Sequence, residues 1–377
     1  MLRDPIPQLF ALCAHLDRSD ELNLQIFKVV KSIKDWENVP QEAELQGMAP
    51  LVNFHLRKSG ATVPEDIQHS FTALSLRHML INQVRTKTLI ELRTVLSQNQ
   101  IPFLVLKGAA LGHLLYPSPA LRPMKDMDIL VKAGDCDKVT PLLINSGFKQ
   151  IIEKFFHPSD LHLPTFSKEI DGFKISIEVH HRLLPDKNGQ FWGYYEKFRS
   201  PNQIIPITDD VTIETINKEE FLYHLCKHTF FSYHNLEALR MIWVADICNF
   251  SERFKADIDW GFLNRNYPLV NHTLAALHEL YSLSPELIEV ARLSPRKNPE
   301  QAIQLYQGWP GIPMRDVKPK DKWQWIVNTI FPSGWVLFLH YGNSRFKAKW
   351  YNWLNHVSNL FSISIRHMQI RLKSKSE

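Results

Sequence analysis

The stretch "LRPMKDMDILV", residues 121–131, decides the fold of this chain, because it puts two acids at the entrance of an apolar strand. In a β-strand, residues i and i+2 point to the same face, about 6.5–7 Å apart. Asp126 and Asp128 therefore project together, while Met127 and Ile129 pack on the other face. Two carboxylates this close repel each other unless a cation lies between them, so the pair predicts a divalent cation site that suits Mg²⁺.

A third acid, Glu178, lies on another predicted strand, "GFKISIEVHHRLL", residues 172–184, and faces the same way as His180. If the two strands are neighbours, three carboxylates converge, as a two-metal phosphoryl or nucleotidyl transfer site requires. The structural alternative is that Asp126 caps the entrance of its strand and Glu178 is a solvent-facing edge residue.

Between these acids and the N-terminal region stands "FLVLKGAALGHLLY", residues 103–116. A strand, then Lys107 and Gly108, then small residues that open a helix can bring backbone amides and a helix N-terminus against phosphate. The patterns GxxxxGK[ST] and GxGxxG are both absent, and a glycine before a helix is also commonly just a turn.

The periodicity of apolar residues predicts an α+β fold. Residues 1–98 have helical patterning, including a long amphipathic helix from about Glu65 to Gln98. Strands and helices alternate in 99–215, which predicts a small mixed-sheet core. Residues 216–294 are again helical, and 295–377 form a linker and C-terminal helices with a basic tail. Within these regions we expect strands at 101–106, 126–132, 148–155 and 172–184, and helices at 5–16, 20–35, 108–116, 135–146, 218–231, 235–254 and 270–292.

Charge is concentrated at the C-terminus. The chain of 377 residues carries a net charge of +5, yet residues 341–377 alone hold seven Lys or Arg and one Glu. The nearly neutral main body argues against a broad nucleic-acid surface. Residues 345–377 have a helical apolar stripe flanked by bases, typical of a helix docked on the protein. The alternative is weak peripheral contact with a membrane, or docking of an acidic partner.

Other features of the sequence favour a cytoplasmic protein. Four scattered cysteines without a CxxC pair are typical of a reducing compartment. The N-terminus has acids too early, and too short an apolar run, for a signal peptide. Residues 323–344 lack formal charges, but Pro332, Ser333 and Gly334 split them, which favours two buried helices around a turn over a membrane span.

Taken together, LKGAAL, YPSPALRPMKDMDILV and IEVHHRL resemble the nucleotidyltransferases of the DNA polymerase beta-like superfamily. More narrowly, the chain is similar to the family labelled uncharacterised nucleotidyltransferase, over roughly residues 40–290. The resemblance implies Mg²⁺ or Mn²⁺ as cofactor, a nucleoside triphosphate (NTP) as substrate, and transfer of a nucleoside monophosphate (NMP) onto a hydroxyl or amine. It assigns Gly108 and Ala109 to the glycine motif, Asp126 and Asp128 to the paired metal ligands, Glu178 to the third acid, and Lys107 and Arg122 to the flanks of the motif.

On this basis we expect Asp126, Asp128 and Glu178 to bind metal and to carry catalysis. Glu178 would ligate the catalytic metal or take the acceptor's proton. The nucleotide would be held by Lys107, Gly108, Ala109 and Arg122, with Arg122 neutralising charge on the leaving pyrophosphate or, alternatively, serving as an ordinary surface arginine. The candidate substrate-binding residues are His180, His224, His228 and Arg240.

The helical half leaves further alternatives open. His224 and His228 are four residues apart and share a helix face, but no HExxH glutamate or third ligand accompanies them as a zinc site requires. Asp246 lies within an apolar stretch and needs a partner, for which we expect Arg240 or a histidine.

Three departures from the superfamily bear on activity. Gly-Ala replaces the usual Gly-Ser or Gly-Gly, the gap from Gly108 to Asp126 is longer, and Glu178 replaces the commoner Asp. They motivate the alternative of a non-catalytic nucleotide-binding or scaffold protein. The acceptor is left open among a small molecule, a peptide, a protein and RNA, although the charge of the main body does not support RNA.

Overall fold

The structure is a computed structural model, and it divides the chain into two compact units. The first comprises Met1–Lys227 and Arg240–Ala302, and the second comprises His228–Leu239 and Ile303–Glu377. The four-part division expected from the sequence pattern stays a prediction. The residues that the structure describes are 4–16, 19–151, 161–183, 194–199, 201–234, 239–294, 322–331, 353–354, 356–358 and 360.

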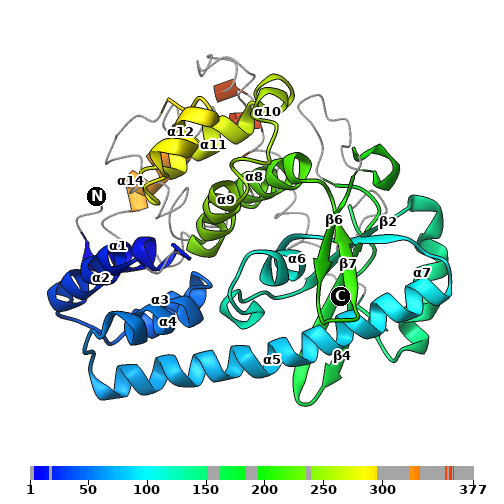
Figure 1. Cartoon of the computed structure of the whole chain (residues 1–377), viewed down its shortest axis with the longest axis horizontal. Helices are drawn as coiled ribbons and strands as arrows, with labels where there is room; N and C mark the ends of the chain where they lie inside the picture. The colour runs from blue at the N-terminus through cyan, green and yellow to red at the C-terminus, as the bar shows by residue number, and fades with distance from the viewer. Residues whose placement is uncertain are drawn as a thin grey trace. The chain divides into compact units, whose positions relative to one another are not determined.

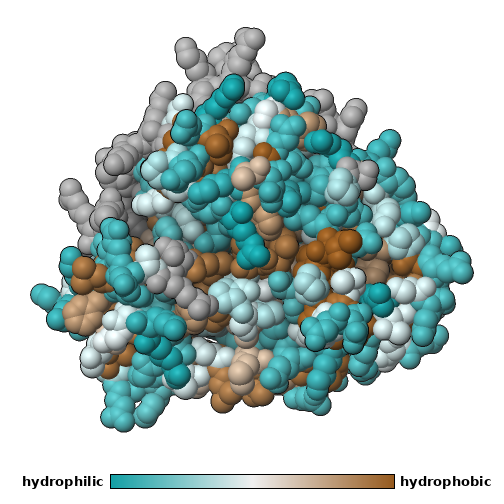
Figure 2. Space-filling view, viewed as in Figure 1, coloured by the Kyte–Doolittle hydropathy of each residue, from teal (hydrophilic) through white to brown (hydrophobic). Residues whose placement is uncertain are grey.

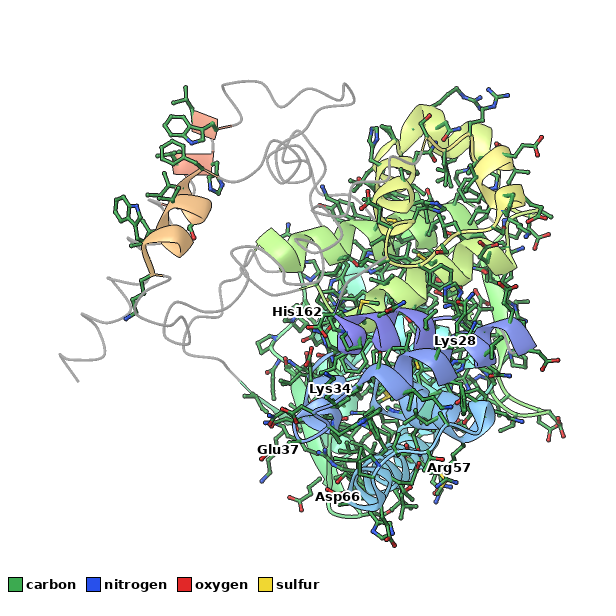
Figure 3. All side chains as sticks on the ribbon, turned by 90° about the vertical axis from the view of Figure 1, so that its left-hand side faces the viewer. Lys28, Lys34, Glu37, Arg57, Asp66 and His162 are labelled. Atoms are coloured by element: carbon green, nitrogen blue, oxygen red, sulfur yellow. The ribbon has the colours of Figure 1, made fainter. Side chains whose placement is uncertain are left out.

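Short helices open the first unit, as the sequence predicts for residues 5–16 and 20–35. Two of them begin at side-chain caps, because Asp4 accepts from the Ile6 amide and Ser19 from the Leu22 amide. Charged side chains of this region, among them Lys28, Lys34, Glu37, Arg57 and Asp66, are exposed (Figure 3). The helices are α1 (Pro5–Cys13), α2 (Asp20–Ser32), α3 (Val39–Leu45) and α4 (Ala49–Ser59).

The long helix α5 (Glu65–Gln98) has the bounds that the sequence predicts and runs along one side of the first unit (Figure 1). It contacts α3 and α4 near its N-terminal half and reaches β5 (Phe173–His180) and α7 (Cys136–Asn145) near its C-terminal half. Its buried residues include Phe71, Leu89, Leu92 and Leu96. This helix therefore joins the N-terminal helices to the sheet.

The sheet has five strands in the order β1-β2-β5-β4-β3. Among the strands that the structure describes here, β2 and β5 pair in parallel and the other pairs are antiparallel, so the sheet is mixed. A mixed sheet among many helices confirms the α+β fold class. The strands are β1 (Phe103–Val105), β2 (Met127–Val131), β3 (Lys149–Gln150), β4 (Phe166–Ile170) and β5, and helix α6 (Lys107–Leu114) connects β1 toward β2.

The hairpin β4–β5 is absent from the sequence predictions. Asp171 and Gly172 form its turn with φ values of 51° and 76°, and an Asp-Gly pair with both φ positive is typical of a two-residue hairpin. That dipeptide is the signal that would have predicted β4. The predicted strand 148–155 is described only to residue 151 and contains the two-residue β3. A second hairpin, β6 (Gln203–Pro206) with β7 (Thr212–Thr215), is also absent from the predictions.

Helices follow the second hairpin. Nearly all of α9 (Met241–Arg253) is buried, and α8 (Lys218–His234) precedes it. The single predicted helix at 270–292 is wrong, because the chain forms α11 (Leu269–Leu277) and α12 (Pro285–Val290) instead. Ser284 starts α12 by accepting from the Leu287 amide, ahead of Pro285. A shorter helix, α10 (Trp260–Asn266), lies before them.

In the second unit, α14 (Lys322–Ile330) is the first of the two helices expected in 323–344, and Trp323 is 73% exposed rather than buried. The ring of His356 binds the Thr329 carbonyl oxygen at 2.8 Å. The second expected helix and nearly all of 345–377 lie outside the described residues. Within the described part of the chain, no helix has the length and hydropathy needed to cross a membrane. The face in Figure 2 is mostly hydrophilic, with hydrophobic residues in small groups.

Candidate functional site

The parallel β2–β5 pair brings two of the predicted acids together. Asp128 on β2 is the register partner of Glu178 on β5. The backbone of Asp128 is also fixed from β1, because its carbonyl accepts from the Leu106 amide at 2.9 Å. All five residues of β2 are buried. The sequence predicted β2 and β5 separately and expected their carboxylates to converge if the two strands were neighbours. The structure shows that they are neighbours.

Asp128 is the centre of the contacts at this site. Its Oδ1 accepts from Lys107 Nζ at 2.6 Å and lies 2.9 Å from His180 Nε2. The carboxylate is only 3% exposed. Burial alone would raise the pKa of Asp128, but attraction to Lys107 and the hydrogen bond with His180 outweigh burial and hold that pKa well below its usual range. Asp128 is therefore a buried anion with two cation-capable partners.

Lys107 occupies an unusual backbone position at the first residue of α6. Its φ is 45°, in the left-handed region that disfavours side chains with a Cβ. Burial would lower the pKa of Lys107, yet Asp128, Glu178 and Asp126 raise it overall, so the amine is charged. Strain of this kind persists only where the surroundings hold it, and here the ion pair with Asp128 does so.

Asp126 lies one residue before β2 and is half-buried. Burial first, and then repulsion from Asp128 and Glu178, raise its pKa to about 6. The carboxylates thus carry more negative charge than their immediate partners neutralise. Asp126 is outside the group of Asp128, Glu178 and His180, whose ligand atoms all lie within 4.8 Å of one another.

The donor set fits a divalent metal. Carboxylate oxygens are the ligands that Mg²⁺ and Mn²⁺ prefer, and a neutral imidazole also serves Mn²⁺. Asp128 and Glu178 could hold one ion between them, Asp126 could add a further oxygen ligand, and His180 could join them only as a neutral imidazole. The raised pKa of Asp126 is independent support, since it arises partly from the neighbouring carboxylates, whose repulsion a cation would relieve.

His180 and a second histidine pack around this group. His180 is buried, and its Nε2 lies 3.6 Å from Glu178 Oε2 as well as close to Asp128. Burial would lower its pKa, but these two carboxylates raise it overall. The ring of His162, labelled in Figure 3, meets the ring of His180 edge-on with centroids 5.2 Å apart. His180 therefore lies between the two carboxylates, at hydrogen-bond distance from Asp128 and at a longer ion-pair distance from Glu178.

Arg85 is a residue of this site that the sequence predictions missed. It lies on the buried side of α5 beside Val84 and Leu89 and is 6% exposed. Burial lowers its pKa to about 10 while Asp126 opposes that shift, and its Nη2 donates to the Lys125 carbonyl at 3.4 Å. A lone arginine among apolar positions of an amphipathic helix was the available signal.

Arg122 is buried and bound to a carboxylate of α9. Its Nε and Nη2 donate to the two oxygens of Asp246 at 3.2 and 2.6 Å, and its Nη1 donates to the Pro123 carbonyl at 3.1 Å. Tyr116 donates to Asp246 Oδ1 at 2.6 Å. The expected partners of Asp246, Arg240 or a histidine, were therefore wrong, because the true partners come from the loop after α6.

The three candidate substrate-binding residues of the helical half, His224, His228 and Arg240, lie in three different surroundings. His224 is buried, and burial together with Lys107 and His180 lowers its pKa to about 3, so its imidazole is neutral. His228, one turn further along α8, belongs to the second unit. Arg240 donates from Nε to the Leu45 carbonyl at 3.2 Å, which ties α9 to the N-terminal helices.

Two described cavities lie elsewhere. One of about 830 Å³ is lined by α1, α2 and the C-terminal part of α9. Another of about 520 Å³ is lined by residues around β6 and the start of α8. None of the three carboxylates lines either cavity, so the chemistry of the side chains, rather than the volume of a hollow, identifies the candidate site.

A small mixed sheet with carboxylates on adjacent strands, and a lysine and a glycine in the first turn of the helix that follows a strand, is the arrangement that nucleotidyltransferases require. The model of the family described as uncharacterised nucleotidyltransferase matches residues 32–278. The chain belongs to this family, which confirms the resemblance drawn from its motifs.

Other comparisons add little. No curated protein matches the chain. Among solved structures, the solution structure of the antibiotic-resistance factor ANT(2'')-Ia is similar with 12% identity and a TM-score of 0.33, over 50% of this chain and 97% of that one. At this TM-score the likeness adds nothing to the assignment.

Proposed function

We propose that the protein is a Mg²⁺-dependent nucleotidyltransferase, with Mn²⁺ as a substitute, that moves an NMP from an NTP onto a hydroxyl or amine acceptor. The observation that carries the proposal is the register of the parallel pair, which puts Asp128 beside Glu178. Family membership supports the transfer of a nucleotidyl group in general. The acceptor is a small molecule, a peptide, a protein or RNA.

In this proposal, the start of α6 holds the triphosphate. The charged amine of Lys107 and the amides of Gly108 and Ala109 face the phosphates, because a helix N-terminus presents unpaired N–H groups and positive potential. Lys107 exchanges its bond with Asp128 for phosphate oxygens when the nucleotide binds. Asp128, Asp126 and Glu178 are the residues that would hold the metal once Lys107 has turned to the phosphates.

The acceptor oxygen or nitrogen attacks the α-phosphorus, and the bond from that phosphorus to the oxygen bridging to the β-phosphorus breaks. The leaving group is pyrophosphate, and the acceptor's proton passes to Glu178 or to water beside it. Bound divalent metal would lower the pKa of the acceptor and neutralise the charge that develops on the phosphates. His180 keeps Asp128 and Glu178 in place while the proton moves.

The decisive experiment compares Asp128→Asn with Asp137→Asn, an exposed aspartate at the first turn of α7. The wild type is incubated with each α-labelled NTP, with Mg²⁺ or Mn²⁺, and with lysate and tRNA as acceptor sources. We expect labelled product and pyrophosphate, a loss of at least about 100-fold in Asp128→Asn, and wild-type rates in Asp137→Asn. Chelation of the metal should stop the reaction in the wild type.

Full activity in Asp128→Asn would remove the proposed function. Tight NTP binding without any pyrophosphate release would instead support the alternative of a nucleotide-binding or scaffold protein. Circular dichroism of Asp128→Asn must accompany the assay, because the variant weakens a buried contact with Lys107.

A further inference from the structure

A buried cluster links the helical half of the chain to the first turn of α6. This turn contains Lys107 and Gly108 and is called the glycine turn below. Asp246 on α9 binds the guanidinium of Arg122 through both carboxylate oxygens and accepts the hydroxyl proton of Tyr116. Arg122 is 8% exposed and Asp246 is 2% exposed. Paired, bidentate geometry of this kind fixes the direction of a guanidinium more tightly than a single contact does.

The same guanidinium lies directly against Gly108. A Cβ added at Gly108 would be 2.1 Å from Arg122 Nη1 and 2.8 Å from its Cζ. Only glycine permits this approach between the start of α6 and the side chain of Arg122. Gly108, which the sequence motif assigns to phosphate binding, is therefore also the residue against which the Arg122 guanidinium packs.

Arg122 also holds the segment that leads to the paired acids. Its Nη1 donates to the Pro123 carbonyl, and the side chain of Met124 lies 3.3 Å from where a Gly108 Cβ would be. One guanidinium thus contacts the first turn of α6 on one side and the residues leading to Asp126 on the other.

Stability alone is a weak reason for such a cluster. A buried ion pair offers little net stabilisation over apolar residues of the same volume, because removing both charges from water opposes folding. What the pair does provide is a fixed distance between the segments it touches. Those segments carry the groups that would bind phosphate and metal.

We propose that Tyr116, Arg122 and Asp246 are positioning residues that hold the glycine turn at a fixed separation from Asp126 and Asp128. This inference rests on the proposed function. It gives Arg122 an effect on the nucleotide through Gly108, not through direct contact with the pyrophosphate. Helix α9 of the helical half thereby sets the distance between the start of α6 and the paired acids.

The test compares Tyr116→Phe with Tyr281→Phe in the full chain. Each removes one buried tyrosine hydroxyl bound to α9 at 2.6 Å, to Asp246 in the first case and to Asn249 in the second. Tyr281→Phe is thus matched in chemistry but removes none of the hydrogen bonds among Tyr116, Arg122 and Asp246. Asp246→Asn is the stronger variant, and Tyr116→Phe keeps the test usable if Asp246→Asn does not fold.

Two readouts are measured. Without nucleotide, hydrogen exchange at the amides of residues 107–110 and 124–128 should quicken in Tyr116→Phe and Asp246→Asn but not in Tyr281→Phe. With NTP and Mg²⁺, kcat/KM should fall by about 10- to 100-fold in the cluster variants, mainly through a higher KM for NTP. Arg122→Lys should show the same loss of kcat/KM although it keeps the positive charge, because an ammonium cannot bind both carboxylate oxygens in the same plane.

The outcomes separate the two proposals. If the wild type transfers NMP and the cluster variants match Tyr281→Phe in both readouts, the positioning role is overturned while the proposed function stands. If the wild type neither binds NTP nor releases pyrophosphate, the proposed function fails and this inference fails with it. A loss of thermal stability alone, at unchanged exchange and kcat/KM, also overturns the positioning role.

Discussion

Asp128 on β2 and Glu178 on β5 are direct neighbours across the only parallel pair of strands in the described sheet. Parallel pairing needs a long crossover, and here the crossover includes α7 and the β3–β4 segment. Two acids distant in sequence thereby reach the same level of the sheet. Because the side-chain period of a strand is two residues, a slip of one residue would separate them onto opposite faces.

Glu178→Gln tests the proposed base or metal ligand. The amide keeps the shape of the side chain but removes its charge and its ability to accept a proton, so transfer should fall by about 10²–10⁴-fold. Glu178→Asp should retain more activity than Glu178→Gln, since it preserves the carboxylate. Steady-state pyrophosphate release measures both variants. Glu169→Gln, exposed on the adjacent strand β4, is the control, and equal rates for it and Glu178→Gln would count against this role.

Lys107 combines a buried ion pair with a strained backbone, and two variants separate these properties. Lys107→Ala and Lys107→Gly both remove the amine from Asp128, which should cost about 3 kcal/mol of unfolding free energy. Only Lys107→Gly relieves the φ of 45°, so it should be more stable than Lys107→Ala by about 1 kcal/mol. Urea unfolding followed by circular dichroism gives both differences. Identical stabilities would show that the left-handed backbone at Lys107 is not kept in solution.

Gly108→Ala and Gly112→Ala differ only in what the new methyl group meets within α6. At Gly108 it collides with the guanidinium of Arg122, which Asp246 prevents from moving freely, so we expect a loss of about 1–3 kcal/mol. At Gly112 the nearest atom is Pro119 Cβ at 3.4 Å, and the higher helix propensity of alanine favours the variant by up to about 1 kcal/mol. Thermal and urea unfolding measure the contrast. A Gly108→Ala protein as stable as Gly112→Ala would contradict the close packing of Arg122.

The pair of Glu44 on α3 and His78 on α5 predicts how stability depends on pH. The hydrogen bond from His78, 2.8 Å from Glu44 Oε2, is the main cause that lowers the pKa of Glu44 below its ordinary value of 4.5. A carboxyl whose folded pKa is lowered adds stability above the unfolded pKa and loses it as pH falls through the folded pKa. Glu44→Gln should therefore be less stable than wild type by about 1 kcal/mol at neutral pH.

That difference should shrink as the pH falls below the ordinary pKa of 4.5 and then through the lowered pKa of the folded-state Glu44 carboxyl, where the side chain takes up its proton. Urea unfolding curves of both proteins across this range provide the measurement. Glu42→Gln on the same helix, which leaves the hydrogen bond between His78 and Glu44 in place, is the comparison variant. A gap between wild type and Glu44→Gln that does not narrow as the pH is lowered below 4.5 would contradict the pairing.

Local periodicity was enough for much of the fold. The bounds of α5 follow from a 3.6-residue apolar repeat with Pro64 and two acids at its start, which act within a few residues of each other. The apolar run after Asp128 likewise requires a buried strand wherever it is placed. The strand β4 was missed because its sequence is polar, although the Asp-Gly turn after it carried the necessary information.

By itself, then, the sequence determined the paired acids at a strand entrance, the lysine-glycine turn and the long helix, because each depends on neighbours along the chain. Only the tertiary structure decided that β2 pairs with β5, that Asp246 binds Arg122, and that Arg85 reaches the segment before Asp126. Those relationships join residues far apart in sequence, and no local pattern of hydrophobicity or charge specifies which distant partner packs against which.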